Sequence, residues 1–76
     1  MWYAEKREVV DSEVELTTVA IRRKSQRSAL RLFEAFVEAE LNVHLGDVRN
    51  LQIERGMVSF VKGDCRVCWN LLQIAG

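Results

Sequence analysis

The sequence predicts an α+β domain in which one amphipathic helix, over about residues 25–45, covers one face of a mainly antiparallel five-stranded sheet. Three observations lead to this prediction. The segment KSQRSALRLFEAFVEAELNVHLG, residues 24–46, is the only one with a sustained helical period. Short segments rich in β-branched and apolar residues lie on both sides of it. The last three of these are joined through Gly56 and Gly63, as is typical of hairpin turns.

The helix is predicted from an apolar arc that covers about half of its circumference. Ser25 is the expected N-cap, because its hydroxyl can accept a hydrogen bond from a free amide of the first turn. Gly46 is the expected stop, because glycine readily takes the left-handed conformation that closes a helix. The centre of the arc is formed by Leu30, Phe33, Val37 and Leu41, and its flanks by Ala29, Leu32, Phe36, Ala39 and Val43.

Glu40 lies inside this apolar arc. An isolated buried carboxylate is costly, so the side chain needs either water or a cation. Two interpretations follow: Glu40 reaches solvent at the edge of the arc, or it pairs with a base across an interface.

Two strands are predicted before the helix, over residues 2–10 and 13–23, with a turn near residues 11–12. In the second strand, Val14 and Leu16 share one face while Val19 and Ile21 share the other. This pattern predicts either a bulge near residues 17–18 or a strand covered on both faces. The charged middle of the first strand, residues 5–8, is typical of an exposed sheet edge.

Three strands are predicted after the helix, over residues 48–54, 57–62 and 65 to about 72. Leu51 and Ile53 alternate with polar residues, and Val67 and Trp69 do the same. We therefore expect a meander with one buried face that the helix covers. The element order is β-β-α-β-β-β, within a single domain spanning residues 1–76.

Composition narrows the class of protein. Eleven basic and eleven acidic residues give a net charge of zero, which argues against a general polyanion binder. The first ten residues do not resemble an export signal, and no apolar run approaches the ~18 residues of a membrane span. We therefore expect a cytoplasmic protein with reduced thiols and no membrane contact. Because a chain of this size has a thin stability margin, and because its helix arc is wide, we also expect a homodimer through Leu32, Ala39 and Val43.

The residue types needed for catalysis or metal binding are sparse. Cys65 and Cys68 form a lone CxxC that would point to opposite faces of a strand, and His44 is the only other soft ligand. The sequence has no phosphate-binding glycine motif and no pair of nucleophile and histidine base. We therefore expect no catalytic site, no metal and no cofactor.

The candidate binding residues form a basic segment without any acid at the start of the helix: Arg22, Arg23, Lys24, Arg27 and Arg31. The segment can be read as a solvated corner, as a contact for a phosphate backbone, or as a contact for an acidic protein surface. Trp2 and Tyr3, near the start of the chain, either pack on the sheet or anchor an interface together with Glu40.

The segments KSQRSALRLF, VRNLQIE, RG and VSFVKGD, in this order of elements, resemble compact phage-encoded anti-CRISPR proteins with one helix on a five-stranded antiparallel sheet. This resemblance is one of pattern, and it implies a protein that blocks a CRISPR surveillance complex. Our first hypothesis is a non-enzymatic interaction protein that binds and inhibits, or adapts, a larger protein or nucleoprotein complex. The alternative is a small nucleic-acid-binding regulator that uses the basic segment.

Overall fold

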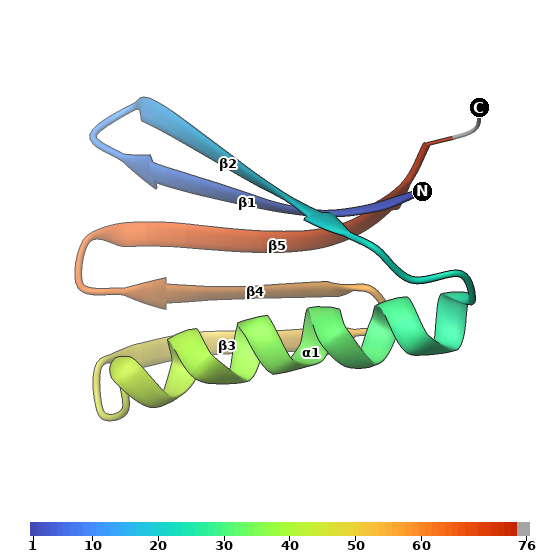
Figure 1. The fold of residues 1–76 in the computed structure, drawn as a ribbon. Coiled ribbons are helices and arrows are strands. Elements are labelled where there is room, and N and C mark those ends of the chain that lie inside the picture. Colours follow the sequence, from blue (N-terminus) through green and yellow to red (C-terminus); the bar gives the residue numbers. More distant parts are fainter. Residues whose placement is uncertain (75–76) are drawn as a thin grey trace.

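A computed structural model describes residues 1–74 of the chain. It confirms the α+β class and the predicted order of elements (Figure 1). The elements are β1 (Trp2–Val10), β2 (Glu13–Ile21), α1 (Gln26–Val43), β3 (Val48–Glu54), β4 (Met57–Lys62) and β5 (Cys65–Gln73).

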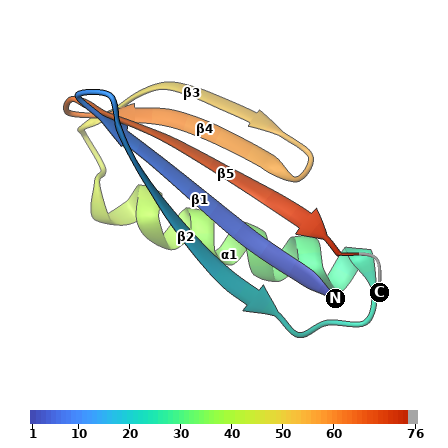
Figure 2. The ribbon, with the colours of Figure 1, turned by 90° about the horizontal axis from the view of Figure 1, so that it is seen from above.

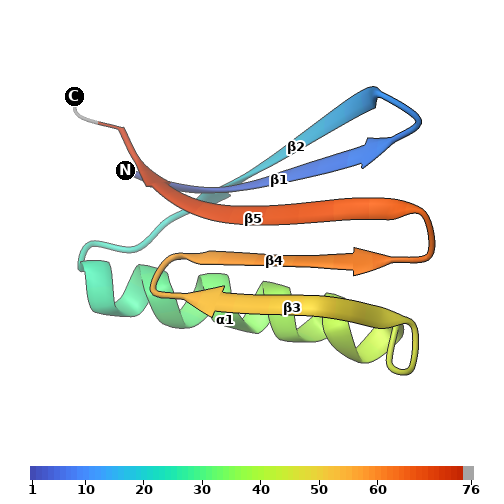
Figure 3. The same cartoon turned by 180° about the vertical axis from the view of Figure 1, so that it is seen from behind.

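The strands form one five-stranded antiparallel sheet in the order β2-β1-β5-β4-β3. Figure 3 shows β5 returning to lie between β4 and β1. The expectation that the charged first strand forms an edge is therefore wrong, since β1 is paired on both sides. Two of the charged side chains of β1 instead form ion pairs on the α1 side of the sheet: Lys6 pairs with Glu40 of α1, and Glu8 pairs with Lys62 of β4.

The core lies between α1 and the middle of the sheet. Phe33 and Val37 of α1 pack on residues of β5, β4 and β1, and the rings of Phe33 and Trp69 meet edge to face with centroids 6.4 Å apart. This arrangement confirms the predicted buried face of β4 and β5. The buried residues are Trp2, Ala4, Ile21, Ala29, Phe33, Val37, Val58, Phe60, Val67 and Trp69.

One helix does not cover the whole sheet. A helix with its side chains is about 10–12 Å wide, whereas strands spaced by about 4.8 Å extend a five-stranded sheet over roughly 19 Å. Figure 2 shows β3 to one side of α1. Leu51 and Ile53 on β3 are accordingly 46% and 66% exposed, so the prediction that they are buried is wrong. The β3 ladder is also irregular between Arg49 and Gln52, where Asn50 has a φ of 54°.

β2 has neither the bulge near residues 17–18 nor the covering on both faces that the sequence predicted. Its register with β1 is continuous over residues 13–21, so there is no bulge. Val14 and Leu16 lie on the face opposite α1 and are 57% and 56% exposed, so that face is not covered. Only the end of β2 near α1 is enclosed, where Ile21 is buried and Val19 is half-buried, because the β1–β2 hairpin rises away from α1 toward its turn (Figure 1).

The helix begins as predicted. Ser25 is the N-cap, and its hydroxyl accepts a hydrogen bond from the Ser28 amide at 3.1 Å. The helix ends earlier than expected: His44 is the C-cap, and Gly46, with a φ of 98°, lies in the following turn. Within the described chain, no helix is long and apolar enough to cross a membrane.

Candidate functional site

The face of the sheet opposite α1 carries no layer of its own in the described chain, and we call it the open face. Strand register places its side chains in rows that cross the sheet. The first row is Leu16, Arg7, Cys68, Ser59 and Gln52; the second is Val14, Val9, Arg66, Val61 and Arg49. Both rows run from one edge of the sheet to the other.

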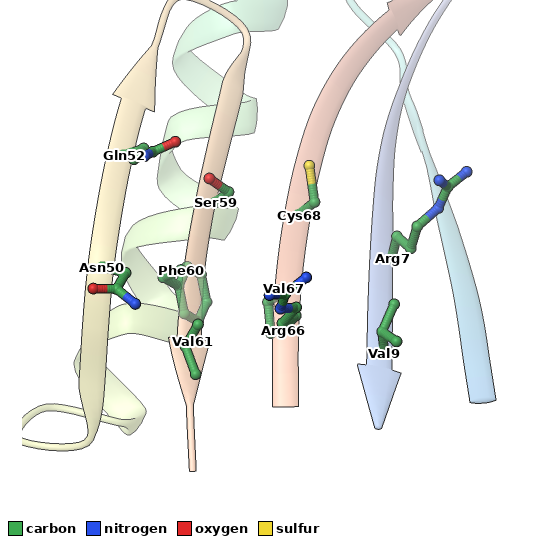
Figure 4. A pocket seen from close by; sticks show the side chains of 10 residues that line it. All are labelled: Arg7, Val9, Asn50, Gln52, Ser59, Phe60, Val61, Arg66, Val67 and Cys68. Carbon is green, nitrogen blue, oxygen red and sulfur yellow. The ribbon is translucent and has the colours of Figure 1, made fainter. Parts of the chain in front are cut away.

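A hollow of about 470 Å³ lies over the middle of these rows (Figure 4). Figure 4 shows side chains from β3, β4, β5 and β1 around it, with α1 behind the sheet. None of the lining residues is acidic. The lining residues are Arg7, Val9, Asn50, Gln52, Ser59, Phe60, Val61, Arg66, Val67 and Cys68.

Arg7 and Arg66 give the hollow its charge. They come from neighbouring strands and lie diagonally across the β1–β5 ladder, and both are exposed. Among residues 1–74 neither guanidinium forms an ion pair, whereas Arg49 donates a 2.7 Å hydrogen bond to the carbonyl of Gly63. Glu5 lies next along β1 on the same face, outside the hollow. The centre of the open face therefore offers two unpaired cations beside apolar and amide groups.

The two cysteines point to opposite faces, as predicted. Cys68 lines the hollow and accepts a 3.4 Å hydrogen bond from the Asn70 amide, whereas Cys65 lies on the α1 side near Glu8. Both thiols are free. In the part of the chain that the structure describes, no group of three or more histidine, cysteine or acidic residues is placed to hold a metal.

Glu40 is the centre of a charged network between α1 and the sheet. Its Oε1 atom accepts from the ammonium groups of Lys6 and of Lys62, the second at 3.2 Å, and its Oε2 atom accepts from Trp69 Nε1 at 2.6 Å. Both lysines also approach Glu8, at 3.4 and 3.5 Å. The Glu40 side chain is only 9% exposed. Glu40 therefore pairs with bases inside its own chain instead of reaching into solvent.

The contacts of Glu40 and Lys62 shift the pKa of each in the direction that favours its charged form. Burial alone would raise the pKa of Glu40, but the bonds from Lys6, Trp69 and Lys62 outweigh it and hold the pKa below 4.5. Burial alone would lower the pKa of Lys62, but Glu40 and Glu8 raise it above 10.5. Glu40 and Lys62 are thus charged at neutral pH, and the ion pairs of Glu40 with Lys6 and Lys62 join α1 to β1 and β4.

The residues of the basic segment are all exposed, between the end of β2 and the first turns of α1. No ion pair involves any of them in the described residues, and the hydrogen bond from Arg23 to the Arg22 carbonyl is local. Arg27 and Arg31 are on α1, which lies behind the sheet in Figure 4, and Arg22, Arg23 and Lys24 are in the connection from β2 to α1; none of the five lines the hollow. The basic segment and the hollow are thus two separate cationic surfaces.

The predicted aromatic anchors lie on different faces. Trp2 is buried in the core at 9% exposure, so packing accounts for it without a partner. Tyr3 is half-buried on the open face, and its hydroxyl lies 3.2 Å from Met1 Sδ. Of the candidate interface residues, Tyr3 is thus the one on a surface available to another molecule.

The hollow was not singled out from the sequence. Alternation on β5 did place Arg66 and Cys68 on the face opposite Val67 and Trp69. Their meeting with Arg7 depends on β1 pairing with β5, across more than fifty residues of chain. The sequence feature that could have indicated the hollow is that Arg7 and Arg66 each alternate with core-facing residues of their strands, and so point to the face opposite α1.

Comparisons with known proteins do not place the chain in a family: no family model, no curated protein and no solved structure matches it.

Proposed function

We propose that this protein is a non-enzymatic interaction protein that docks on a larger protein or nucleoprotein assembly, through its open face, and inhibits or adapts it. The observation that carries the proposal is the hollow over the open face, whose lining has no acid and two arginines that form no ion pair within the described chain. Arginine is enriched in protein interfaces because it combines charge, planar hydrogen bonding and apolar surface.

The surroundings of the hollow support a protein surface as its partner. Val14, Leu16 and Leu72 add exposed apolar area to the same face, at 57%, 56% and 43% exposure. Carboxylates of a partner would complement Arg7 and Arg66, while its apolar side chains would cover the valines. A single-stranded nucleic acid would require exposed aromatic rings for base stacking, and on the open face of residues 1–74 only Tyr3 is aromatic.

The test is affinity capture from a nuclease-treated bacterial lysate with two matched double variants. Arg7→Glu with Arg66→Glu reverses charge in the hollow, and Arg23→Glu with Arg27→Glu makes the same charge change in the basic segment. We expect the wild-type chain and the basic-segment variant to retain the same protein at equal yield, and the hollow variant to lose it. Equal capture by the hollow variant, shown to be folded by circular dichroism, would overturn the proposal.

The second candidate function is nucleic-acid binding by the basic segment. Five exposed cations surround the start of α1 and have no ion partner among residues 1–74, and they favour a phosphate backbone. In this case Arg23→Glu with Arg27→Glu would abolish binding of a fluorescent oligonucleotide, and affinity would fall log-linearly with salt. Capture that disappears on nuclease treatment would favour this function over docking by the open face.

Two narrower expectations remain proposals. Capture of a CRISPR surveillance complex would support the anti-CRISPR resemblance, and capture of an unrelated assembly would remove it. For the homodimer, Leu32 packs on the core, while Ala39 and Val43 stay exposed on the flank of α1. Light scattering at micromolar concentration should return about twice the chain mass of 8.8 kDa if this flank forms the dimer.

A further inference from the structure

The outer edge of β2 is a regular strand edge without a partner in the described chain. β2 is the first strand in the sheet order, so only one of its sides is paired, with β1. That pairing continues without a shift from Glu13 to Ile21, and the strand EVELTTVAI contains no proline, lysine or arginine. Such an edge presents a row of free amide and carbonyl groups that can pair with another strand.

The other edge of the sheet differs. β3 is shorter, its ladder shifts between Arg49 and Gln52, and Asn50 has a positive φ. Bulges of this kind interrupt pairing and protect a strand from further addition. Of the two edges, β2 is therefore the one suited to accept a strand.

The side chains of β2 define what would fit. Residues 13–18 are exposed. Glu13 and Glu15 point to one face and have no ion pair within residues 1–74, while Val14 and Leu16 point to the other. A hollow of about 170 Å³ lies beside these residues and is lined by Glu8, Val10, Glu13, Val14, Glu15 and Cys65.

We propose that the β2 edge binds an extended segment of another protein whose side chains alternate between basic and apolar, as a sixth strand of the sheet. Residues that are directly opposite on paired strands share a face, so basic side chains would meet Glu13 and Glu15, and apolar ones would meet Val14 and Leu16. A second copy of this chain fits poorly. Full antiparallel pairing of two β2 strands would set Glu13 and Glu15 opposite Ile21 and Val19 of the other copy, and because β2 contains no lysine or arginine, neither glutamate would meet a base.

The probe is the acetylated, amidated peptide KVKVTVKV with a fluorescent label, added to the full chain. We expect binding in fluorescence anisotropy, and amide chemical shift changes confined to residues 13–19 with slower amide exchange there. Two further peptides carry N-methyl groups on every second residue, one in each phase. The peptide whose methyl groups point at β2 should bind at least tenfold more weakly than the unmethylated peptide, because it lacks the amide donors that an added strand must supply.

Charge complementarity is tested with matched variants. Glu13→Lys with Glu15→Lys should weaken binding of the peptide about tenfold at low salt. Glu34→Lys with Glu38→Lys makes the same net change on the exposed side of α1 and should leave affinity unchanged. The proposal is overturned if the peptide fails to bind at millimolar concentration. It is equally overturned if both N-methylated forms bind like the parent, if the shifts centre on β3 or the open face, or if the α1 variant loses as much affinity. None of these results depends on the hollow over Arg7 and Arg66.

Discussion

Replacing Glu40 by Gln should destabilise the protein far more than its place on a helix surface suggests. Gln keeps the size and helix propensity of Glu, and its oxygen can still accept from Trp69 Nε1. It removes the carboxylate that neutralises Lys6 and Lys62, both of which are 18% exposed. The change therefore leaves two partly buried ammonium groups whose one remaining counter-charge among residues 1–74 is Glu8.

The magnitude follows from burial. Breaking a fully buried ion pair costs about 3–5 kcal/mol, and breaking an exposed one costs about 0–1 kcal/mol. At 9% exposure the Glu40 side chain lies nearer the buried limit, so we expect a loss of about 2–3 kcal/mol. A domain of 76 residues has roughly 4–11 kcal/mol of stability in total. The variant should therefore remain folded but be clearly weakened.

Urea unfolding monitored by tryptophan fluorescence measures this loss, with Trp69 in direct contact with Glu40. The midpoint should fall by about 1–2 M, taking a slope of about 1.5 kcal/mol per molar urea. Glu38→Gln, on the exposed side of α1, is the control and should change stability by less than about 0.5 kcal/mol. A double-mutant cycle with Lys6→Met should give a coupling of about 1–2 kcal/mol. A Glu40→Gln loss below about 0.5 kcal/mol would refute the reasoning.

Three further predictions concern the same fold. The pKa of Glu40 is lowered in the folded protein, so its contribution to the free energy of unfolding is fully present above about pH 4.5 and is lost as the pH falls through the lower folded value. The pKa of Lys62 is raised, so its contribution to the free energy of unfolding is fully present below about pH 10.5 and is lost as the pH rises through the higher folded value. In urea midpoints measured across pH, the difference between the wild type and Glu40→Gln should be constant above about pH 4.5 and should shrink as the pH falls through the lower folded value; a difference that does not change with pH would contradict this origin. Ser25→Ala removes the N-cap bond and should cost about 1 kcal/mol, or about 4–8 °C in Tm, whereas Ser28→Ala, whose amide but not hydroxyl is used, should not. Phe33→Ala empties the largest fully buried side-chain site and should cost about 3–5 kcal/mol by urea titration, with an effect under about 1 kcal/mol showing that α1 is not held by this contact.

The hydrophobic periods of the sequence were sufficient to predict the helix and the five strands, but not which strands lie next to each other in the sheet. Ser25, Gly56 and Gly63 marked boundaries that the structure confirms, because caps and tight turns depend on residues close in the chain. The place of β1 in the sheet depends on β5, which follows more than fifty residues later. The charges of β1 therefore resembled an edge, whereas Lys6 and Glu8 serve partners on α1 and β4.

The sequence predicted which face of the sheet a strand residue points to better than it predicted whether that residue is buried. Ile53 does point to the same face as Val58, its partner across the β3–β4 ladder. It is exposed because α1 is too narrow to reach the edge strand, a fact of packing geometry that alternation does not contain. The hollow around Arg7 and Arg66 was missed because it forms only when four strands lie side by side, and strand order could not be read from the sequence.

The central claim is that the open face is the docking surface, and Cys68 provides a reporter inside it. In a Cys65→Ser variant, Cys68 is the one remaining thiol of a chain that has two. The rate at which N-ethylmaleimide modifies Cys68 would be measured for the free protein and for its complex with the captured partner. We predict at least tenfold slower modification in the complex, because a docked partner covers the hollow. Modification at the same rate in both would contradict the account and place the interface elsewhere on the molecule.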